Sequence, residues 1–314
     1  MSKYLAITGG VGGAKLALGL SKILTPAELA FVVNTGDDFQ HIGLHVSPDV
    51  DTLMYTLAGL DNPETGWGRV GESWNFIETF AGLGGESWFN LGDRDLAVHA
   101  RRTQLLRAGH SLSDVIHLLY AANSIPFTTW PMSDDPAPTR VLTDAGELDF
   151  QHYFVRERCQ PVVKKINLAA AGRALANPKV LEFLSDPDLA GVVICPSNPF
   201  LSIDPLLAMP ELRSALAATQ APVIAISPLV GGDAVKGPTA KIMRELGLPQ
   251  DAGEIASHYG DLLDGFVLDQ TDADLEIKIT HSGLAVRVAQ TFMQTLDDRV
   301  DLAQTALGFL QQLK

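Results

Sequence analysis

The sequence has few cysteines and no long apolar run, and each absence excludes a class of protein. Its two cysteines, Cys159 and Cys195, are too far apart to form a Cys-x-x-Cys pair, so neither a disulfide framework nor a thiolate zinc site is indicated. No stretch approaches the roughly 20 consecutive apolar residues of a membrane span. The first residues also lack the pattern of a signal peptide. We therefore expect a cytoplasmic protein that does not insert into a membrane.

Basic residues are also scarce. The chain carries 23 lysines and arginines against 37 aspartates and glutamates, a formal net charge of −14. Such a surface repels a phosphate backbone, so we expect no nucleic-acid partner. An anionic ligand would have to be held by local groups. The 314 residues suffice for one large domain or two modest ones.

Four short apolar runs each end in a polar loop. The loops that follow them lie at residues 9–13, 34–38, 195–199 and 227–232. After the first loop, apolar residues recur at helical spacing from Ala14. This alternation predicts an α/β fold with a Rossmann-like, mainly parallel sheet and helices on both faces. Because ligands bind beyond the carboxyl ends of such strands, the four loops should converge on one crevice.

The character of the sequence changes in the middle of the chain. Residues 51–159 show helical periodicity and a proline-rich loop, and we interpret them as a mostly helical insertion or cap that contributes to an acceptor site. Residues 1–50 and 160–314 would then form the nucleotide-binding core. Near the C-terminus we expect strands at 265–268 and 275–279 and a helix from about residue 300.

The first loop is rich in glycine and contains Gly10, Gly12 and Gly13, followed by Lys15. Bare backbone amides at a helix N-terminus favour a bound phosphate. The loop is not a Walker motif, since Leu16 follows the lysine, and it matches the dinucleotide fingerprint only loosely. A tight turn without a ligand is the alternative.

Carboxylates are concentrated in the next two motifs, where Asp37 and Asp38 follow a strand and Asp49 and Asp51 precede a helix. Magnesium prefers oxygen ligands and is commonly held by one or two carboxylates together with substrate phosphates. The alternatives are helix capping by Asp49 and Asp51 and a solvated loop position for Asp38.

Further along, Asp93 and Arg94 follow the aromatic pair Trp88 and Phe89. The guanidinium could bind a phosphate or carboxylate, or could form a local ion pair with Asp93 or Asp95. Later polar loops contribute three more candidates for a phosphate or nucleoside, or for ordinary turns: Asn198, Lys236 and Lys241. Four histidines without a zinc-site spacing are second-rank candidates, namely His41, His45, His99 and His152.

Taken together, these loops resemble a known family. The motifs that carry the resemblance are GGVGGAK at 9–15, NTGDD at 34–38, SPDVDT at 47–52, WFNLGDRDLA at 88–97, PMSDD at 131–135, FQHYFV at 150–155, PSNP at 196–199 and SPLVGG at 227–232 with the segment that continues to Lys241. In order and spacing, over nearly the whole chain, they are similar to the 2-phospho-L-lactate transferases of coenzyme F-420 biosynthesis.

The resemblance implies a magnesium-dependent reaction. A guanosine diphosphate donor, such as lactyl-2-diphospho-5′-guanosine, would pass its phospho-acid group to the ribityl hydroxyl of the deazaflavin FO, and GMP would leave. The acid could be 2-phospho-L-lactate, phosphoenolpyruvate or 3-phosphoglycerate. Relatives also suggest a homodimer.

Roles for individual residues follow from the same resemblance. Asp37 and Asp51 would bind Mg²⁺, and catalysis would involve Asp49, Asp51 and Arg94. Substrate binding would fall to Gly10, Gly12, Gly13, Lys15, Asp49, Asp93, Arg94, Asn198, Lys236 and Lys241. Two rival functions stay open: a non-enzymatic regulator that binds a nucleotide sugar on a related fold, and an NAD-dependent oxidoreductase.

Overall fold

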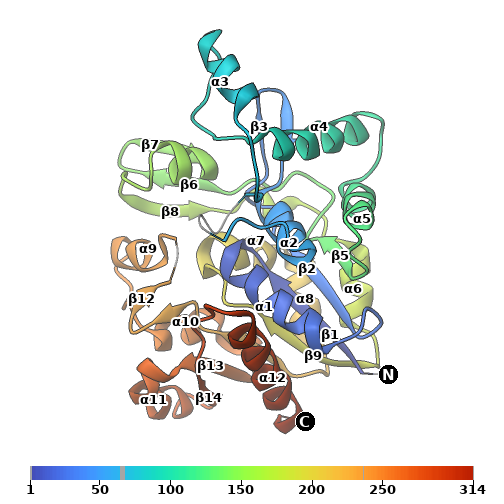
Figure 1. The fold of residues 1–314 in the computed structure, drawn as a ribbon. Helices are drawn as coiled ribbons and strands as arrows, with labels where there is room; N and C mark the ends of the chain where they lie inside the picture. Colours follow the sequence, from blue (N-terminus) through green and yellow to red (C-terminus); the bar gives the residue numbers. More distant parts are fainter. Residues whose placement is uncertain (1, 64–67, 236, 314) are drawn as a thin grey trace.

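A seven-stranded parallel sheet forms the centre of the protein, which the computed structural model describes for residues 2–63, 68–235 and 237–313 (Figure 1). The strand order is β14-β13-β10-β9-β1-β2-β5. The bounds are β1 (Lys3–Thr8), β2 (Leu29–Val33), β5 (Thr128–Pro131), β9 (Leu189–Ile194), β10 (Val223–Ile226), β13 (Gly265–Asp269) and β14 (Ala285–Ala289). The chain winds outward from β1 to β5, then returns to β9 and continues in the opposite direction. This is Rossmann-like topology, so the predicted fold class is confirmed.

Helices cover both faces of this sheet (Figure 1). Successive side chains of a strand point to opposite faces, so Tyr4 and Ala6 belong to one buried core, and Leu5 and Ile7 to the other. The first core is formed with α1 (Gly10–Ile23), α2 (Pro48–Ala58), α4 (Asp93–Arg107), α5 (Leu112–Ala122) and α12 (Leu296–Gln312). The second is formed with α6 (Pro178–Leu184), α7 (Asp204–Leu207), α8 (Pro210–Ala218), α9 (Thr239–Glu245) and α10 (Ala252–Tyr259). Among the described residues, no helix is both long and apolar enough to cross a membrane.

The division of the chain differs from the one predicted at residues 51 and 159. Strand β5 lies between those limits, yet it pairs with β2 in the central sheet. A three-stranded antiparallel sheet crosses the second limit with β6 (Arg140–Thr143), β7 (Gly146–Asp149) and β8 (Val163–Asn167). The part that projects from the sheet comprises α3 (Asn75–Gly82), α4 and the hairpin β3 (Phe39–His41) with β4 (Leu44–Val46) (Figure 1). Helical periodicity alone did not reveal that β5 closes one edge of the core.

Near the C-terminus one predicted element is wrong and one strand was missed. Residues 275–279, expected as a strand, lie mostly in α11 (Glu276–Thr280). Their alternation of apolar and polar residues is misleading, because Ile277 is 68% exposed and Ile279 is buried. The strand beside β13 is β14 instead. Helix α12 begins at Leu296 rather than near residue 300, since Thr295 and Asp298 form a capping box at its start.

Candidate active site

A cavity of about 620 Å³ opens at the carboxyl ends of β1 and β9, where the strand order reverses. This is the switch point at which open α/β sheets bind ligands. All four predicted loops contribute to its wall, through Gly9–Gly12, Asp37, Pro196–Asn198 and Ser227. The expectation that they converge on one crevice is therefore confirmed. A hairpin of β11 (Leu229–Val230) and β12 (Asp233–Ala234) continues from the last loop, and Val230 lines the same cavity.

The glycine-rich loop is the first turn of α1, which begins four residues earlier than its apolar pattern predicted. Gly10 has φ +64°, a conformation that a residue with a side chain rarely adopts. A Cβ on Gly12 would overlap the carbonyl oxygen of Pro196, so only glycine lets α1 approach the loop after β9. Gly13 packs instead against Thr8 and is not part of the cavity wall.

Lys15 lies one turn into α1 and lines the cavity. Its Nζ donates a hydrogen bond to the carbonyl oxygen of Met293 at 2.9 Å. This bond joins α1 to the segment after β14, where Thr291, Phe292 and Met293 form part of the cavity wall. That segment was not predicted as part of the site, because the strand before it was expected at residues 275–279 and lies ten residues later, at Ala285–Ala289.

Asp49 faces the cavity from the first turn of α2. Its Oδ1 accepts a hydrogen bond from the Gly10 amide at 2.7 Å, and its Oδ2 accepts one from Asn34 Nδ2 at 2.9 Å. It therefore caps the N-terminus of α1. The alternative drawn from the sequence, that Asp49 caps its own helix α2, is not what the structure shows. Burial raises the pKa of Asp49 to about 6, although the bonds from Asn34 and Gly10 act in the opposite direction.

Asp37 and Asp38 have different environments. Asp38 accepts hydrogen bonds from His45 Nε2 at 2.9 Å and from Ser47 Oγ at 2.7 Å, so it holds the loop together. Asp37 lines the cavity, and its Oδ1 has no hydrogen-bond partner among the described residues. Burial, together with the negative charges of Asp49 and Asp38, raises the pKa of Asp37 well above its usual value. Among the described residues, Asp37 is thus a buried carboxyl group without a compensating charge beside it.

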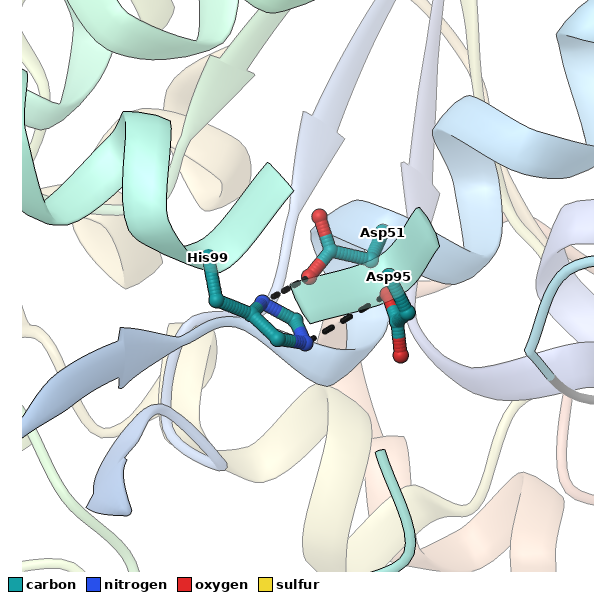
Figure 2. Close-up of side chains that lie close together, drawn as sticks. All are labelled: Asp51, Asp95 and His99. Carbon is teal, nitrogen blue, oxygen red and sulfur yellow. Dashed lines mark ion pairs between the residues drawn. The ribbon is translucent and has the colours of Figure 1, made fainter. Parts of the chain in front are cut away.

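Asp51 lies behind this wall rather than in it. Its Oδ1 forms a buried ion pair with Arg102 Nη2, and its Oδ2 lies 3.6 Å from His99 Nδ1. Figure 2 shows the His99 ring between the carboxylates of Asp51 and Asp95. Such a group of three could hold a metal ion by its geometry, but the Arg102 guanidinium already supplies a positive charge there. Asp51 thus contacts Arg102 and His99 and is not on the cavity wall beside Asp37. Its role as a metal ligand stays a prediction.

Asp93 and Arg94 do not reach the cavity either. The Asp93 carboxylate accepts hydrogen bonds from Ser73, Asn75 and Phe76 and so caps α3. The Arg94 side chain is exposed. Within the same motif, Phe89 and Asn90 do line the cavity.

Of the three later candidates, one lines the cavity, one lies away from it and one is outside the described residues. Asn198 lines the cavity, and its Oδ1 caps the short helix Pro199–Ile203 while its Nδ2 has no partner among the described residues. Lys241 lies away from the wall, where it pairs with Glu245 at 2.6 Å and donates to the Pro161 carbonyl at 3.0 Å. Lys236 is outside the described residues.

The four second-rank histidines lie outside the cavity wall. His45 holds Asp38, and His99 belongs to the network behind the wall. His41 and His152 flank the Trp88 ring at centroid distances of 5.1 and 4.5 Å. Gln151, Phe150 and Phe154, which lie next to His152 in the sequence, line the cavity and were not assigned a role from the sequence.

These features define the protein as an α/β protein of Rossmann-like topology with an acidic cavity at its switch point. The chain belongs to the family of 2-phospho-L-lactate transferase CofD, which it matches over residues 5–297. The resemblance stated from the motifs is therefore confirmed, and the chain is a transferase of that family.

Relatives agree with this assignment, and a solved structure agrees with the fold. A phosphoenolpyruvate transferase from Streptomyces griseus is 38% identical over 318 residues, which cover 99% of each chain. A 2-phospho-L-lactate transferase from Methanosarcina mazei is 34% identical over 300 residues, covering 96% of this chain and 98% of the relative. The crystal structure of a UPF0052 family member from Bacillus halodurans superposes with a TM-score of 0.62 at 13% identity, over 98% of this chain and 99% of that one. This last likeness concerns the fold.

Proposed function

We propose that this protein transfers a phospho-acid group from a guanosine diphosphate donor to the ribityl hydroxyl of the deazaflavin FO, in coenzyme F-420 biosynthesis. The hydroxyl oxygen attacks the phosphorus that bears the acid, the bond from that phosphorus to the oxygen of GMP breaks, and the hydroxyl proton passes to a base. The observation that carries the proposal is the pair of buried carboxylates, Asp37 and Asp49, in the same switch-point cavity as a glycine-rich helix N-terminus, whose Gly10 amide donates to Asp49.

The donor fits the glycine side of the cavity. Backbone amides of the first turn of α1, the ammonium of Lys15 and the amide of Asn198 line that side and suit a diphosphate. Phosphoryl transfer depends mostly on such positioning and on neutralised charge. Gly13, behind the wall, shapes the turn rather than touching the donor.

A divalent cation fits the same cavity. The described wall carries the carboxylates of Asp37 and Asp49 against the single ammonium of Lys15, and a diphosphate would add further negative charge. Asp37 Oδ1 is buried without a partner, which suits a hard cation with oxygen ligands. Asp37, together with the phosphates of the donor, would hold Mg²⁺, which when bound neutralises charge on the transferred group. Asp49 then stays available for the proton of the acceptor, and Asp51 would support both carboxylates from behind.

The acceptor fits the aromatic side. Phe89, Phe150 and Phe154 line the cavity together with prolines and valines, and flat apolar side chains of this kind suit a deazaflavin ring. Asp49 is the base we propose for the hydroxyl proton, because a carboxyl group with a pKa of about 6 can both bind and release a proton near neutral pH.

The relatives give only an order in which to assay the candidate acids. Phosphoenolpyruvate transferases among them are up to 38% identical, and the 2-phospho-L-lactate transferase from Methanosarcina mazei is 34% identical. We therefore propose phosphoenolpyruvate as the first acid to assay, followed by 2-phospho-L-lactate and 3-phosphoglycerate.

The test is an assay of the purified protein with FO, Mg²⁺, GTP and each acid, with a guanylyltransferase that forms the labile donor and mass detection of the deazaflavin product. Asp49→Asn should lower kcat/KM by roughly 100-fold or more, because it removes the proposed base. Asp301→Asn, an exposed position on α12, is the matched control and should keep wild-type activity. A wild-type protein that makes no product with any acid, while binding GDP, would refute the transfer reaction.

A further inference from the structure

The two carboxylates of the cavity wall come from different segments, and something must hold them at a constant separation. Asp37 lies in the loop after β2, and Asp49 lies on α2, with the β3–β4 hairpin between them in the chain. A shift of about 1 Å between catalytic groups can cost about 100-fold in rate. The element that fixes both segments therefore matters to the reaction although it touches no substrate.

Helix α4 supplies the contact to both segments through one side chain. Arg102 is fully buried, and its Nη2 binds the Asp51 carboxylate on α2, two residues beyond Asp49. Its Nη1 lies 3.4 Å from the carbonyl oxygen of His45 at the end of the hairpin. The guanidinium thus spans the short segment from residue 45 to residue 51.

His45 carries the connection on to the other carboxylate. Its Nε2 binds Asp38, the neighbour of Asp37, at 2.9 Å. Its backbone amide donates to Thr103 Oγ1 at 2.7 Å, so α4 forms hydrogen bonds with both the amide and the carbonyl oxygen of His45. Arg102 and its neighbour Thr103 consequently connect α4 to the loops of both wall carboxylates.

The remaining polar groups around Arg102 keep its guanidinium in place. Because arginine can only donate, His99 Nδ1, 3.1 Å from Arg102 Nη1, must accept, which leaves the proton on Nε2. That nitrogen faces Asp95 at 3.3 Å, and Asp95 also accepts a hydrogen bond from Tyr55 on α2 at 2.5 Å (Figure 2). Helices α2 and α4 are therefore joined by a polar ladder whose central cation is Arg102.

We propose that Arg102 is a positioning residue of the transfer reaction: through Asp51 and His45 it fixes the relative positions of Asp49 and Asp37. Lysine cannot replace it, because a single ammonium group lacks the planar fork that reaches a carboxylate, an imidazole and a carbonyl together. The inference rests on the proposed function only where kcat/KM is measured. The measurement of Mn²⁺ binding depends on the geometry of the carboxylates alone.

The binding readout uses Mn²⁺ and GDP as probes, with bound Mn²⁺ measured by electron paramagnetic resonance. Arg102→Lys should raise the Kd for Mn²⁺ by roughly tenfold or more and lower kcat/KM by a similar factor or more. A control with a comparable loss of packing at a residue outside the cavity wall, Leu302→Ala on α12, should lower the melting temperature while leaving the Kd for Mn²⁺ unchanged.

A paired variant covers the case in which the lysine variant does not fold. Replacing both partners, Asp51→Leu with Arg102→Met, removes the buried ion pair as a whole, so that neither of its charges is left without the other, and such exchanges commonly preserve the fold. We expect this folded variant to show the same weakened Mn²⁺ binding. Wild-type Mn²⁺ affinity in the paired variant would overturn the proposal. If the wild-type protein lacked transferase activity, the proposed function would fail, while the Mn²⁺ measurement would still decide the role of Arg102.

Discussion

At the scale of the residue, the site depends on how few partners its buried carboxylates have. Asp49 has one donor for each oxygen, whereas Asp37, among the described residues, has the side chain of Gln151, with Nε2 at 3.4 Å, for one oxygen and no partner for the other. Burial of a carboxylate favours its neutral form, and each hydrogen bond from a donor partly restores the charged form. The balance at Asp49 leaves a pKa of about 6, whereas Asp93, with several donors at the surface, has a pKa lowered to about 2.

The raised pKa of Asp49 predicts how stability changes with pH in the protein without a divalent cation. The folded state binds this proton more tightly than the unfolded chain, so folding stability falls as pH rises from about 4 to about 6. The shift corresponds to about 3 kcal/mol. Relative to Asp49→Asn, which cannot ionise, the wild-type protein should lose about 2 kcal/mol of this unfolding free energy between pH 4 and pH 6, and the rest outside that interval. Urea titrations at the two ends of the interval measure it, and a constant difference between the proteins would contradict the assignment.

At the scale of the element, the critical contact is between the first turn of α1 and the loop after β9. Gly12 lies against the Pro196 carbonyl oxygen, and the Gly9 amide donates to Ser197 Oγ at 3.3 Å. The two segments lie side by side because β1 and β9 are neighbours at the switch point. Their close approach forms the narrow wall at which we place the diphosphate.

Gly12→Ala should therefore weaken both the fold and the proposed ligand site. The added methyl group would overlap the Pro196 oxygen, and forced overpacking of this kind costs about 1–3 kcal/mol. Calorimetric titration with GDP and Mg²⁺ should show weaker binding than in the wild type, because the separated segments no longer present their amides together.

Gly308→Ala is the matched control for that substitution. Gly308 lies within α12, and a Cβ there meets nothing within 4 Å. Alanine should raise stability by about 0.5–1 kcal/mol at this helical position and leave GDP binding unchanged. Equal GDP affinity in the Gly12 and Gly308 variants would show that the glycine-rich turn does not contact the ligand.

At the scale of the whole molecule, the cavity lies where several segments meet. Its wall includes residues that follow β1, β2, β9, β10 and β14, together with the first turns of α1 and α2. A ligand that contacts all of them binds only the folded state and therefore stabilises the entire chain.

GDP and Mg²⁺ together should consequently raise the melting temperature. At a ligand concentration about 100 times its Kd the gain is about 2.7 kcal/mol, or about 5 °C for a chain of this size. Thermal scans with GDP, a UDP-sugar and NAD, each with and without Mg²⁺, compare the proposed function with its rivals. Stabilisation by NAD that is independent of Mg²⁺, with none by GDP, would contradict the proposed guanosine diphosphate donor.

The sequence by itself determined the parallel α/β core, the loops that converge at its switch point and the family, because buried strands and glycine-rich turns depend on local patterns of apolar residues and backbone freedom. It could not show that Asp51 turns away to Arg102, that Asp93 caps α3 or that Lys241 pairs with Glu245. The strand β14 and the wall segment after it were also missed. Only the tertiary structure decided these points. A charged side chain takes its partner from groups that are distant in sequence, and the burial that shifts the pKa of such a side chain is a property of the packed molecule.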